Sequence, residues 1–535
     1  MKVEVFIEAS NRVAPRVKED SSLTKIILCQ GFFYTKKGGE DMLQPKLEQV
    51  KEIAALHEYK KVPILREIYS DFKTPIEVLR VLKSVSNHCY MLESIENSEK
   101  WGRYTFLGFD PKLELICMNG KLTVNAGMKL TMETTHPAEY IRKIIEENKS
   151  PKIEGFPSFT GGLVGYFAYD YIKYSEPKLE LEAGDEEKFK DVDLMLFDKV
   201  IVFDHFKNKM LFIVNMDIEE EAGVEIEYNR AQMELEKMVH LVKTGTPSDI
   251  PKGVLKSDIK ALFSKEEYCQ MVEKAKHYIR EGDIFQVVLS NRLEADFEGS
   301  LFDTYRVLRT INPSPYMFYF SGEDMEIAGA SPETLVKLQD GTLHTFPLAG
   351  TRPRGRNEEE DRQLEEGLRK DPKECAEHNM LVDLGRNDLG KISKFGSVEV
   401  ERYMDVLKYS HVMHIGSTVK GTIREDKDAL DAVDAVLPAG TLSGAPKIRA
   451  CEIINELEKN KRGIYGGAIG YIDFTGNLDT AIAIRIAYKK NNKVYVRSGA
   501  GIVADSVPET EYQECINKAR AALKALEMAQ GGLDE

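Results

Sequence analysis

The sequence predicts an α+β fold with antiparallel sheets, and three observations favour this class. Apolar and polar residues alternate in neighbouring runs that tight turns connect, as in residues 195–216 and 466–503, and strands connected in this way pair antiparallel. Helical patterns flank groups of strands and do not alternate with single strands, which disfavours a doubly wound sheet. A hydrophobic fraction of 42% with 30% charged residues over 535 residues indicates a globular chain with a large core.

Charge, cysteine content and hydropathy exclude several classes of partner. A formal net charge of -15 disfavours nucleic acid and anionic membranes as partners. The seven cysteines are scattered and form no C-x-x-C motif, which predicts a reducing, cytoplasmic compartment. No apolar run approaches the roughly 18 residues of a membrane span, and the first residues show no signal-peptide core.

The chain is predicted to divide into four segments. Residues 1–41 lack periodicity and precede Met42 with a Lys-Lys-Gly-Gly-Glu-Asp run, whose purine-rich codons resemble a ribosome-binding site, so we expect a leader or a disordered extension. Residues 42–245 are predicted to form an N-terminal domain, 246–256 a linker rich in Gly, Pro, Ser and Thr, and 257–530 the catalytic domain. No internal repeat is evident.

The predicted elements begin and end with recognisable signals. A Thr-Pro pair opens a helix, an Asn-Gly pair marks a hairpin, and Ser264 with Glu267 forms a capping box. In chain order we expect a helix over 74–85, strands over 88–94 and 102–127, a hairpin over 195–216, a charged helix over 220–241, and a helix and a strand over 264–293. These are followed by a Gly-rich turn and a helix over 439–460, one antiparallel meander over 466–503 with turns at 475–477 and 491–492, and a closing helix over 509–529.

Two distant pairs of glutamates share one spacing. Glu374 and Glu377 form the first E-x-x-E pair, and Glu511 and Glu514 form the second. Residues three apart share a helix face, so each pair should present two carboxylates together. One such pair is usually a solvated surface feature, but two facing pairs would suit Mg²⁺, which prefers oxygen ligands. The scarcity of His and the absence of His/Cys clusters disfavour zinc.

Polar residues also interrupt the apolar pattern that follows the first pair. They are Asp383, Arg386, Asn387 and Asp388. Because buried charges need partners, this stretch is predicted to hold a structured polar site.

Arg485 and three glycine-rich stretches are the candidate anion-binding features. On a continuous strand Arg485 would share its face only with alanines, which leaves open space for a carboxylate above the guanidinium. The next strand ends in the glycine-rich run 498–501, where a ligand could approach backbone N–H groups. The turn 437–450, with Ser443 as the N-cap, would present a helix N-terminus to an anion. The Gly/Arg segment 347–356 is either a phosphate site or simply a basic loop.

Taken together, these motifs resemble the chorismate-utilising enzymes, and within them the large subunit of anthranilate synthase. The matching stretches are "FQVVLSNR", "NPSPYMFY", "GASPETLV", "PLAGTRPRG", "EHNMLVDLGRNDLGK", "HVMHIGSTVKG", "PAGTLSGAPK", "GIYGGAIGYID", "AIRIA" and "GAGIVADSVPETEYQE". They cover roughly residues 265–525, and "YMLESIENSEKWGRYTFLG" extends the resemblance towards residue 65. The resemblance implies large antiparallel sheets packed in a sandwich and flanked by helices, with an active-site cleft between subdomains.

The resemblance also implies roles for individual residues. Glu377 and Glu514 would ligate Mg²⁺, with Glu374 and Glu511 holding its waters. Glu333 would be the general acid that protonates the departing hydroxyl group. The remaining positions are His414 and Thr441 as positioning and proton-transfer residues, and Gly350, Thr351, Tyr465, Arg485, Gly499, Ala500, Gly501 and Lys518 as chorismate contacts.

The implied reaction converts chorismate and ammonia into anthranilate and pyruvate. A separate glutamine amidotransferase subunit would supply the ammonia, in a heterotetramer of two large and two small subunits. Feedback inhibition by L-tryptophan is implied by a site formed by Glu93, Ser94, Pro315, Tyr316 and Met317.

Two positions bear on the sub-family. Relatives that make aminodeoxychorismate carry Lys where this chain has Ala349, and relatives that add water carry Lys where it has Gln286. Without these lysines, ammonia as an external nucleophile is favoured. Aminodeoxychorismate synthase is the alternative enzyme, and an inactive scaffold or ligand-binding regulator is the alternative from another class.

Overall fold

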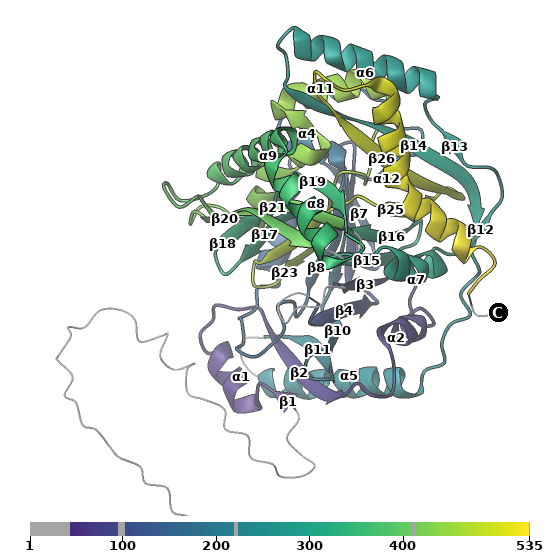
Figure 1. The fold of residues 1–535 in the computed structure, drawn as a ribbon. Coiled ribbons are helices and arrows are strands. Elements are labelled where there is room, and N and C mark those ends of the chain that lie inside the picture. Colours follow the sequence, from purple (N-terminus) through teal and green to yellow (C-terminus); the bar gives the residue numbers. More distant parts are fainter. Residues whose placement is uncertain (1–42, 95–101, 219–222, 409–411, 534–535) are drawn as a thin grey trace, which may run out of the picture. The chain divides into compact units, whose positions relative to one another are not determined.

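The computed structural model describes residues 43–94, 102–218, 223–408 and 412–533 (Figure 1). The predicted leader, residues 1–41, lies outside the described residues. Among the described helices, none is both long enough and apolar enough to cross a membrane.

Most predicted helices are confirmed, with small shifts of their ends. Thr74 caps α2, and Ser264 and Glu267 form the expected capping box of α6. The charged helix α5 ends at Thr244, three residues later than predicted. The helices are α1 (Leu47–Ala54), α2 (Pro75–Leu82), α3 (Pro137–Glu146), α4 (Ile172–Ser175), α5 (Val224–Thr244), α6 (Lys265–Arg280), α7 (Phe302–Ile311), α8 (Glu358–Lys370), α9 (Pro372–Gly390), α10 (Ala429–Val436), α11 (Lys447–Glu458) and α12 (Pro508–Ala529), with 3₁₀ turns η2 (Tyr169–Tyr171) and η3 (Gly440–Leu442).

The strands form two large sheets whose pairings are all antiparallel, as the sequence predicts. The 14-stranded sheet contains β1 (Leu43–Gln44), β2 (Lys61–Tyr69), β3 (Cys89–Glu93), β4 (Tyr104–Phe109), β10 (Lys199–Asp204), β11 (Lys209–Asp217), β12 (Val254–Leu255), β13 (Lys260–Ala261), β14 (Gln286–Glu298), β15 (Tyr316–Ser321), β16 (Met325–Ser331), β22 (Gly444–Ala445), β25 (Ile486–Lys490) and β26 (Lys493–Ile502). The 12-stranded sheet contains β5 (Leu113–Met118), β6 (Lys121–Asn125), β7 (Lys129–Glu133), β8 (Gly162–Phe167), β9 (Val192–Phe197), β17 (Thr334–Gln339), β18 (Thr342–Thr345), β19 (Leu348–Pro353), β20 (Glu399–Lys408), β21 (Val412–Thr422), β23 (Ala468–Asp473) and β24 (Leu478–Ile482).

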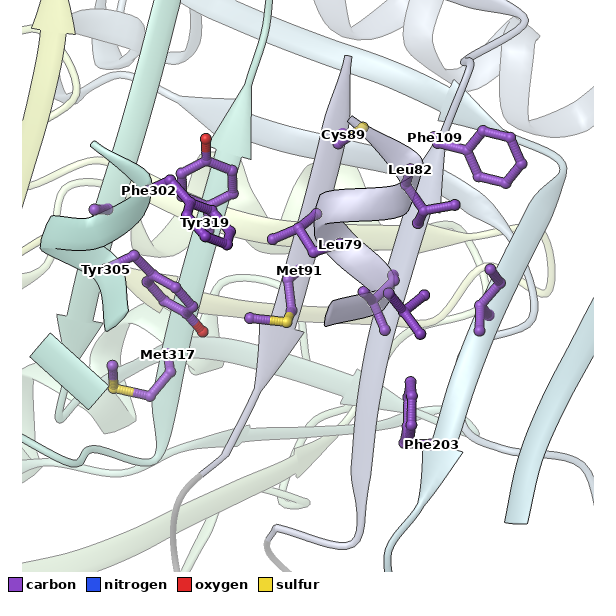
Figure 2. Close-up of a cluster of buried hydrophobic side chains, with 14 of the residues drawn as sticks. Leu79, Leu82, Cys89, Met91, Phe109, Phe203, Phe302, Tyr305, Met317 and Tyr319 are labelled. Atoms are coloured by element: carbon purple, nitrogen blue, oxygen red, sulfur yellow. The ribbon is translucent and has the colours of Figure 1, made fainter. Parts of the chain in front are cut away.

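Apolar side chains fill three layers around these sheets, which gives the order helix, sheet, sheet, helix. The inner core between the sheets includes Tyr90, Val164 and Ile486. Helices α2, α5, α7 and α12 pack on the outer face of the 14-stranded sheet; Figure 2 shows Leu79 of α2 and Tyr305 of α7 in this layer. Helices α3, α9 and α10 pack on the outer face of the other sheet. The predicted sandwich flanked by helices is therefore confirmed.

The strand order contains a repeat that the sequence analysis did not detect. From its centre, the 14-stranded sheet runs β3, β4, β10, β11, β2 on one side and β15, β16, β25, β26, β14 on the other. From its own centre, the 12-stranded sheet runs β8, β9, β5, β6 on one side and β23, β24, β17, β18 on the other. The counterparts follow one another in the same chain order, and α5 and α12 come after the last strand of each set. The expectation of no internal repeat was wrong at the level of topology.

In each half, two strand runs pass side by side from one sheet to the other. In the second half, β16 continues into β17 through Pro332 and Glu333, and β24 continues into β25 through residues 483–485. The prediction of one meander over 466–503 was therefore wrong, because β23 and β24 belong to one sheet and β25 and β26 to the other. The two turns predicted within it are present.

The predicted domain boundary at 246–256 follows α5, the last helix of the first half. Both sheets nevertheless contain strands from each side of this segment. The division into domains at this point remains a prediction.

Candidate active site

The paired crossovers of the second half bring Glu333 and Arg485 into one region. Ile482 donates its N–H to the carbonyl of Glu333 at 3.0 Å, and Ala330 donates to the carbonyl of Arg485 at 3.3 Å. These backbone bonds hold the two segments beside each other, so that an acid from one crossover and a cation from the other belong to the same site.

Arg485 lies in the break between β24 and β25. The prediction that it lies on a continuous strand was therefore wrong. Its φ of 53° is in the left-handed region, which is costly for a residue other than glycine. Desolvation of the guanidinium lowers the pKa of Arg485. Among the described residues, this guanidinium has no hydrogen-bond or ion-pair partner, so it is available to an anion.

Glu333 is held by the 3₁₀ turn η3. The hydroxyl of Thr441 donates to Oε1 of Glu333 at 3.1 Å. Desolvation raises the pKa of Glu333 to about 8, while the bond from Thr441 and the charge of Lys518 oppose this shift. The carboxyl is therefore mostly protonated at neutral pH, which is the state that a general acid requires.

Both glutamate pairs lie on helices, as the spacing predicts, within the first two turns of α9 and α12. Asp371 caps α9 and accepts from two backbone N–H groups. Burial raises the pKa of Glu377 and of Glu511, and in both cases the charge of Glu514 contributes. Lys518 lies 2.7 Å from Oε1 of Glu514. Helices that are distant in sequence thus place their carboxylates within electrostatic reach of each other.

These glutamates fit a cation that is shared with a ligand. No group of three or more His, Cys, Asp or Glu side chains within the described residues is arranged to hold a metal ion by itself. Burial and the negative charges of Glu374 and Glu514 all raise the pKa of Glu377. A divalent cation would relieve this repulsion, and Mg²⁺ is commonly held by one or two carboxylates, waters and an anionic substrate.

Gly350, Thr351 and His414 form the wall next to α9. A bulge in the β19–β21 pairing lies at Gly350, whose φ is 67°. A Cβ atom here would lie 3.1 Å from Oε2 of Glu374, so glycine allows this close approach. His414 Nδ1 donates to the carbonyl of Gly350 at 2.8 Å. Burial lowers the pKa of His414, which makes it a neutral imidazole with Nε2 as its basic nitrogen.

Tyr465 and the run 499–501 form the opposite wall. A Cβ atom on Gly499 would lie 2.6 Å from the Leu289 carbonyl and 3.1 Å from the Tyr465 hydroxyl. Strand β25 pairs with β26 only as far as Val496, so the edge of the stretch that follows has no partner strand within the described residues. Burial raises the pKa of Tyr465, which therefore keeps its hydroxyl hydrogen as a donor.

Two predicted features of the neighbouring helices were wrong. Ser443 does not cap α11; its hydroxyl donates to the carbonyl of Ala439, and Pro446 occupies the N-cap. Of the four polar residues that were predicted to form a site in α9, only Asp388 is buried, where it pairs with Lys447 at 2.8 Å. The other three lie on the exposed face of the helix, because they fall outside the stripe that packs on the sheet.

The segment 347–356 is not a free basic loop. Much of it forms β19, and two of its three arginines pair with acids in or next to α8 and α9. Arg352 lies 2.8 Å from Asp371 and 3.1 Å from Glu374, and Arg354 lies 2.8 Å from Asp361. This pairing disfavours the phosphate site that the sequence left open.

The residues predicted to bind tryptophan gather around the end of β3 and the start of β15. Glu93 already accepts from the hydroxyl of Tyr305 at 2.5 Å and from Arg309 at 2.9 Å. Tyr316 lies on the opposite face of the sheet, towards the inner core, where its hydroxyl donates to Asp479 at 2.9 Å. The buried hydroxyl of Ser94 has no partner among the described residues.

The remaining members of this set occupy different surroundings. Pro315 is partly exposed, whereas Met317 is buried on the α7 side beside Tyr305 (Figure 2). A cavity of about 210 Å³ opens nearby and is lined by Tyr104 and Tyr471.

A buried ionic cluster behind the site was missed by the sequence analysis. Glu458 pairs with both Arg462 and Arg497, and all three are about 1% exposed. Arg497 shares its strand face with Tyr495 and Gly499, and this lack of polar neighbours was a signal of burial. Arg462 lies in a Lys- and Asn-rich turn, which gave no such signal.

Comparisons with known proteins agree with this geometry. The family model described as chorismate binding enzyme matches residues 87–524. Anthranilate synthase component 1 of Acetivibrio thermocellus is 46% identical over 91% of this chain and 99% of its own, and that of Aquifex aeolicus is 44% identical over 92% and 100%. The chain therefore belongs to the family of chorismate-binding enzymes, in the branch of anthranilate synthase component 1.

Solved structures show the same fold. Component I of anthranilate synthase from Streptococcus pneumoniae TIGR4 superposes with a TM-score of 0.71 at 39% identity, covering 80% of this chain and 93% of that one. The menaquinone-specific isochorismate synthase from Escherichia coli superposes with a TM-score of 0.63 at 19% identity, which bears on the fold alone.

Proposed function

We propose that this chain is the chorismate-converting subunit of an anthranilate synthase, which forms anthranilate and pyruvate from chorismate and ammonia. Family membership supports this reaction. The observation that carries it is the unpaired guanidinium of Arg485 beside the protonated carboxyl of Glu333 on adjoining crossovers. Together they provide an anchor for a carboxylate and a proton for a leaving hydroxyl group.

Arg485 binds the carboxylate of the enolpyruvyl arm in this proposal. Its guanidinium can form two parallel hydrogen bonds with a carboxylate, and the Tyr465 hydroxyl adds a third donor. Backbone N–H groups of Gly499 and Gly501 can complete the cradle, because alternate residues of β26 direct theirs to its free edge, whereas the N–H of Ala500 faces Leu289 of β14. These contacts fix the ring relative to Glu333.

Glu333 donates its proton to the C4 hydroxyl group, which leaves as water while ammonia attacks C2. The hydroxyl of Thr441 holds the carboxyl in place for this step. His414 has a basic Nε2 and serves in the later loss of the C2 proton and of pyruvate, with Gly350 and Thr351 lining the ring. Ammonia as the nucleophile agrees with Ala349 and Gln286, where relatives with other chemistries carry lysines.

Mg²⁺ is proposed as the cofactor. Glu377 and Glu514 would hold it, with Glu374 and Glu511 accepting from its waters, and the ion would neutralise the ring carboxylate of chorismate. Replacing Glu377 by Gln removes one ligand of the ion and also part of the repulsion among the carboxylates, which burial strengthens. We expect Mg²⁺ with chorismate to raise the Tm of the wild-type chain and not that of Glu377→Gln. Asp383→Asn, on the exposed face of the same helix, is the matched control and should keep the shift.

Several finer features remain predictions. They are the glutamine amidotransferase partner, the heterotetramer, inhibition by L-tryptophan and a cytoplasmic location. None of the five residues predicted to bind tryptophan lines the cavity beside Tyr104 and Tyr471, and Glu93 would have to exchange Arg309 for a ligand. Aminodeoxychorismate synthase is the alternative reaction, and Ala349 argues against it.

The test uses the purified chain with chorismate, Mg²⁺ and an ammonium salt at alkaline pH, where free ammonia is abundant. We expect anthranilate to appear by its fluorescence, together with equimolar pyruvate. Accumulation of aminodeoxychorismate without pyruvate would replace the proposal with the alternative reaction.

A further inference from the structure

Arg462 is a buried cation that contacts three elements of the site without reaching its interior. Its Nε and Nη2 donate to the two oxygens of Glu458 at 3.0 and 2.6 Å. Its Nη1 donates to the carbonyl of Leu442 at 2.5 Å, and its Nη2 to that of Val288 at 2.6 Å. The residue is 1% exposed, so all of these bonds are shielded from water.

One of these bonds fixes the turn that carries Thr441. Leu442 directly follows Thr441 in η3, which has only three residues. So short a 3₁₀ turn has little internal hydrogen bonding, and its position depends on contacts from outside. The bond from Arg462 to the Leu442 carbonyl therefore acts on the position of the hydroxyl that donates to Glu333.

The aromatic contacts of Arg462 concern the opposite wall. Its guanidinium lies 4.6 Å from the ring centre of Tyr169 and 5.9 Å from that of Tyr465. Planar guanidinium groups favour aromatic faces. The same side chain thus supports the ring whose hydroxyl lies against Gly499.

We infer that Arg462 is a positioning residue. Its planar guanidinium holds the Thr441 hydroxyl in place for Glu333, and the Tyr465 ring in place beside Arg485. It shares Glu458 with Arg497 of β26, so one carboxylate couples η3, β14 and the free edge of β26. The effect of Arg462 on kcat rests on the proposed function, whereas its effect on the pKa of Glu333 does not.

The experiment compares Arg462→Lys with Arg292→Lys in the full chain. Lys keeps the charge and loses the planar fork. Arg292 lies on the site-forming strand β14 and, like Arg462, is a buried cation that pairs with acids and lies over an aromatic ring, that of Tyr495 at 5.3 Å. Its acid partners, Glu187 and Glu294, lie outside η3. The titration of Glu333 is read from the infrared band of its protonated carboxyl, assigned by its loss in Glu333→Gln.

The Thr441 bond favours the ionised carboxylate, so its loss raises the pKa of Glu333. We expect Arg462→Lys to move the Glu333 midpoint upward by about half a unit or more, and Thr441→Val to do the same. Arg292→Lys should leave it unchanged. In the kinetics at constant free ammonia, Arg462→Lys should lower kcat by about 10-fold or more and move the basic limb to higher pH.

An unchanged midpoint in folded Arg462→Lys, or the same shift in Arg292→Lys, would overturn the inference. If Arg462→Lys does not fold, Tyr169→Leu removes the stacked ring, and it should shift the midpoint in the same direction by less; no shift there also overturns it. Absence of anthranilate from the wild-type chain would refute the proposed function instead, since the Glu333 titration is measured without turnover.

Discussion

Each half of the chain contains the same paired crossover between the sheets, and each crossover contains one acid and one cation, in exchanged positions. In the first half, Lys112 directly precedes β5 and Asp198 lies between β9 and β10; their side chains pair at 2.8 Å. In the second half, Glu333 directly precedes β17 and Arg485 precedes β25. The acid and the cation have exchanged places, and within the described residues they do not pair with each other.

This difference separates a structural crossover from a functional one. A closed pair satisfies both charges and leaves little for a ligand. An open pair keeps a neutral acid and a cation in a poorly hydrated site, which costs stability and, in the proposed function, serves substrate binding and proton transfer. Thr441 is an additional partner in the second half. It donates a hydrogen bond to Glu333, so that this carboxyl has a partner other than Arg485 and the charge of Arg485 is not neutralised.

The largest expected effect comes from neutralising the acid of each crossover. Glu333→Gln should lower kcat by about 10²–10⁴-fold, since the amide cannot donate the required proton. Asp198→Asn should leave kcat within about 3-fold, because this carboxylate belongs to the closed crossover. Steady-state kinetics of both variants at neutral pH provide the measurement. Equal losses in the two variants would show that both crossovers serve only the fold.

Removal of the cation should have opposite effects on the stability of the two crossovers. Lys112→Met leaves the buried Asp198 unpaired, which should lower the free energy of unfolding by about 1–3 kcal/mol. Arg485→Met removes a cation without a partner and should raise it by about 1 kcal/mol, while KM for chorismate rises. Urea unfolding measures both changes. A loss of stability in Arg485→Met would mean that its charge is compensated in the free protein.

A pH dependence of the free energy of unfolding is expected for the open crossover alone. The folded pKa of Glu333, about 8, lies above its ordinary value of 4.5. Its neutral form therefore contributes stability below pH 4.5, and this contribution is lost as the pH rises towards 8. The difference in free energy of unfolding between wild type and Glu333→Gln should fall by at most about 4–5 kcal/mol over this range. A difference independent of pH would contradict the raised pKa.

The local sequence around the crossovers carried more information than was used. Pro111 and Pro332 each stand eight residues before a turn, Asn119-Gly120 or Asp340-Gly341, in which both residues have positive φ. This shared spacing indicated the repeat directly. It was missed because overall identity between the halves is low, while turn geometry constrains only a few positions.

The sequence by itself determined the secondary structure, the antiparallel class and the faces of the two glutamate helices. These features depend on neighbours within a few residues: alternation, capping boxes and turn residues act over one or two turns of chain. The motifs also identified the residues that the structure later brings together.

Only the tertiary structure decided which sheet each strand joins, and hence that Glu333 and Arg485 occupy crossovers. Strands of either sheet show similar apolar patterns, so the choice rests on pairings between residues more than a hundred positions apart. The same holds for burial of charge. Arg462 resembles a surface residue in sequence, and besides its neighbour Glu458 it is enclosed by Leu442 and Val288, which lie 20 and 174 positions away.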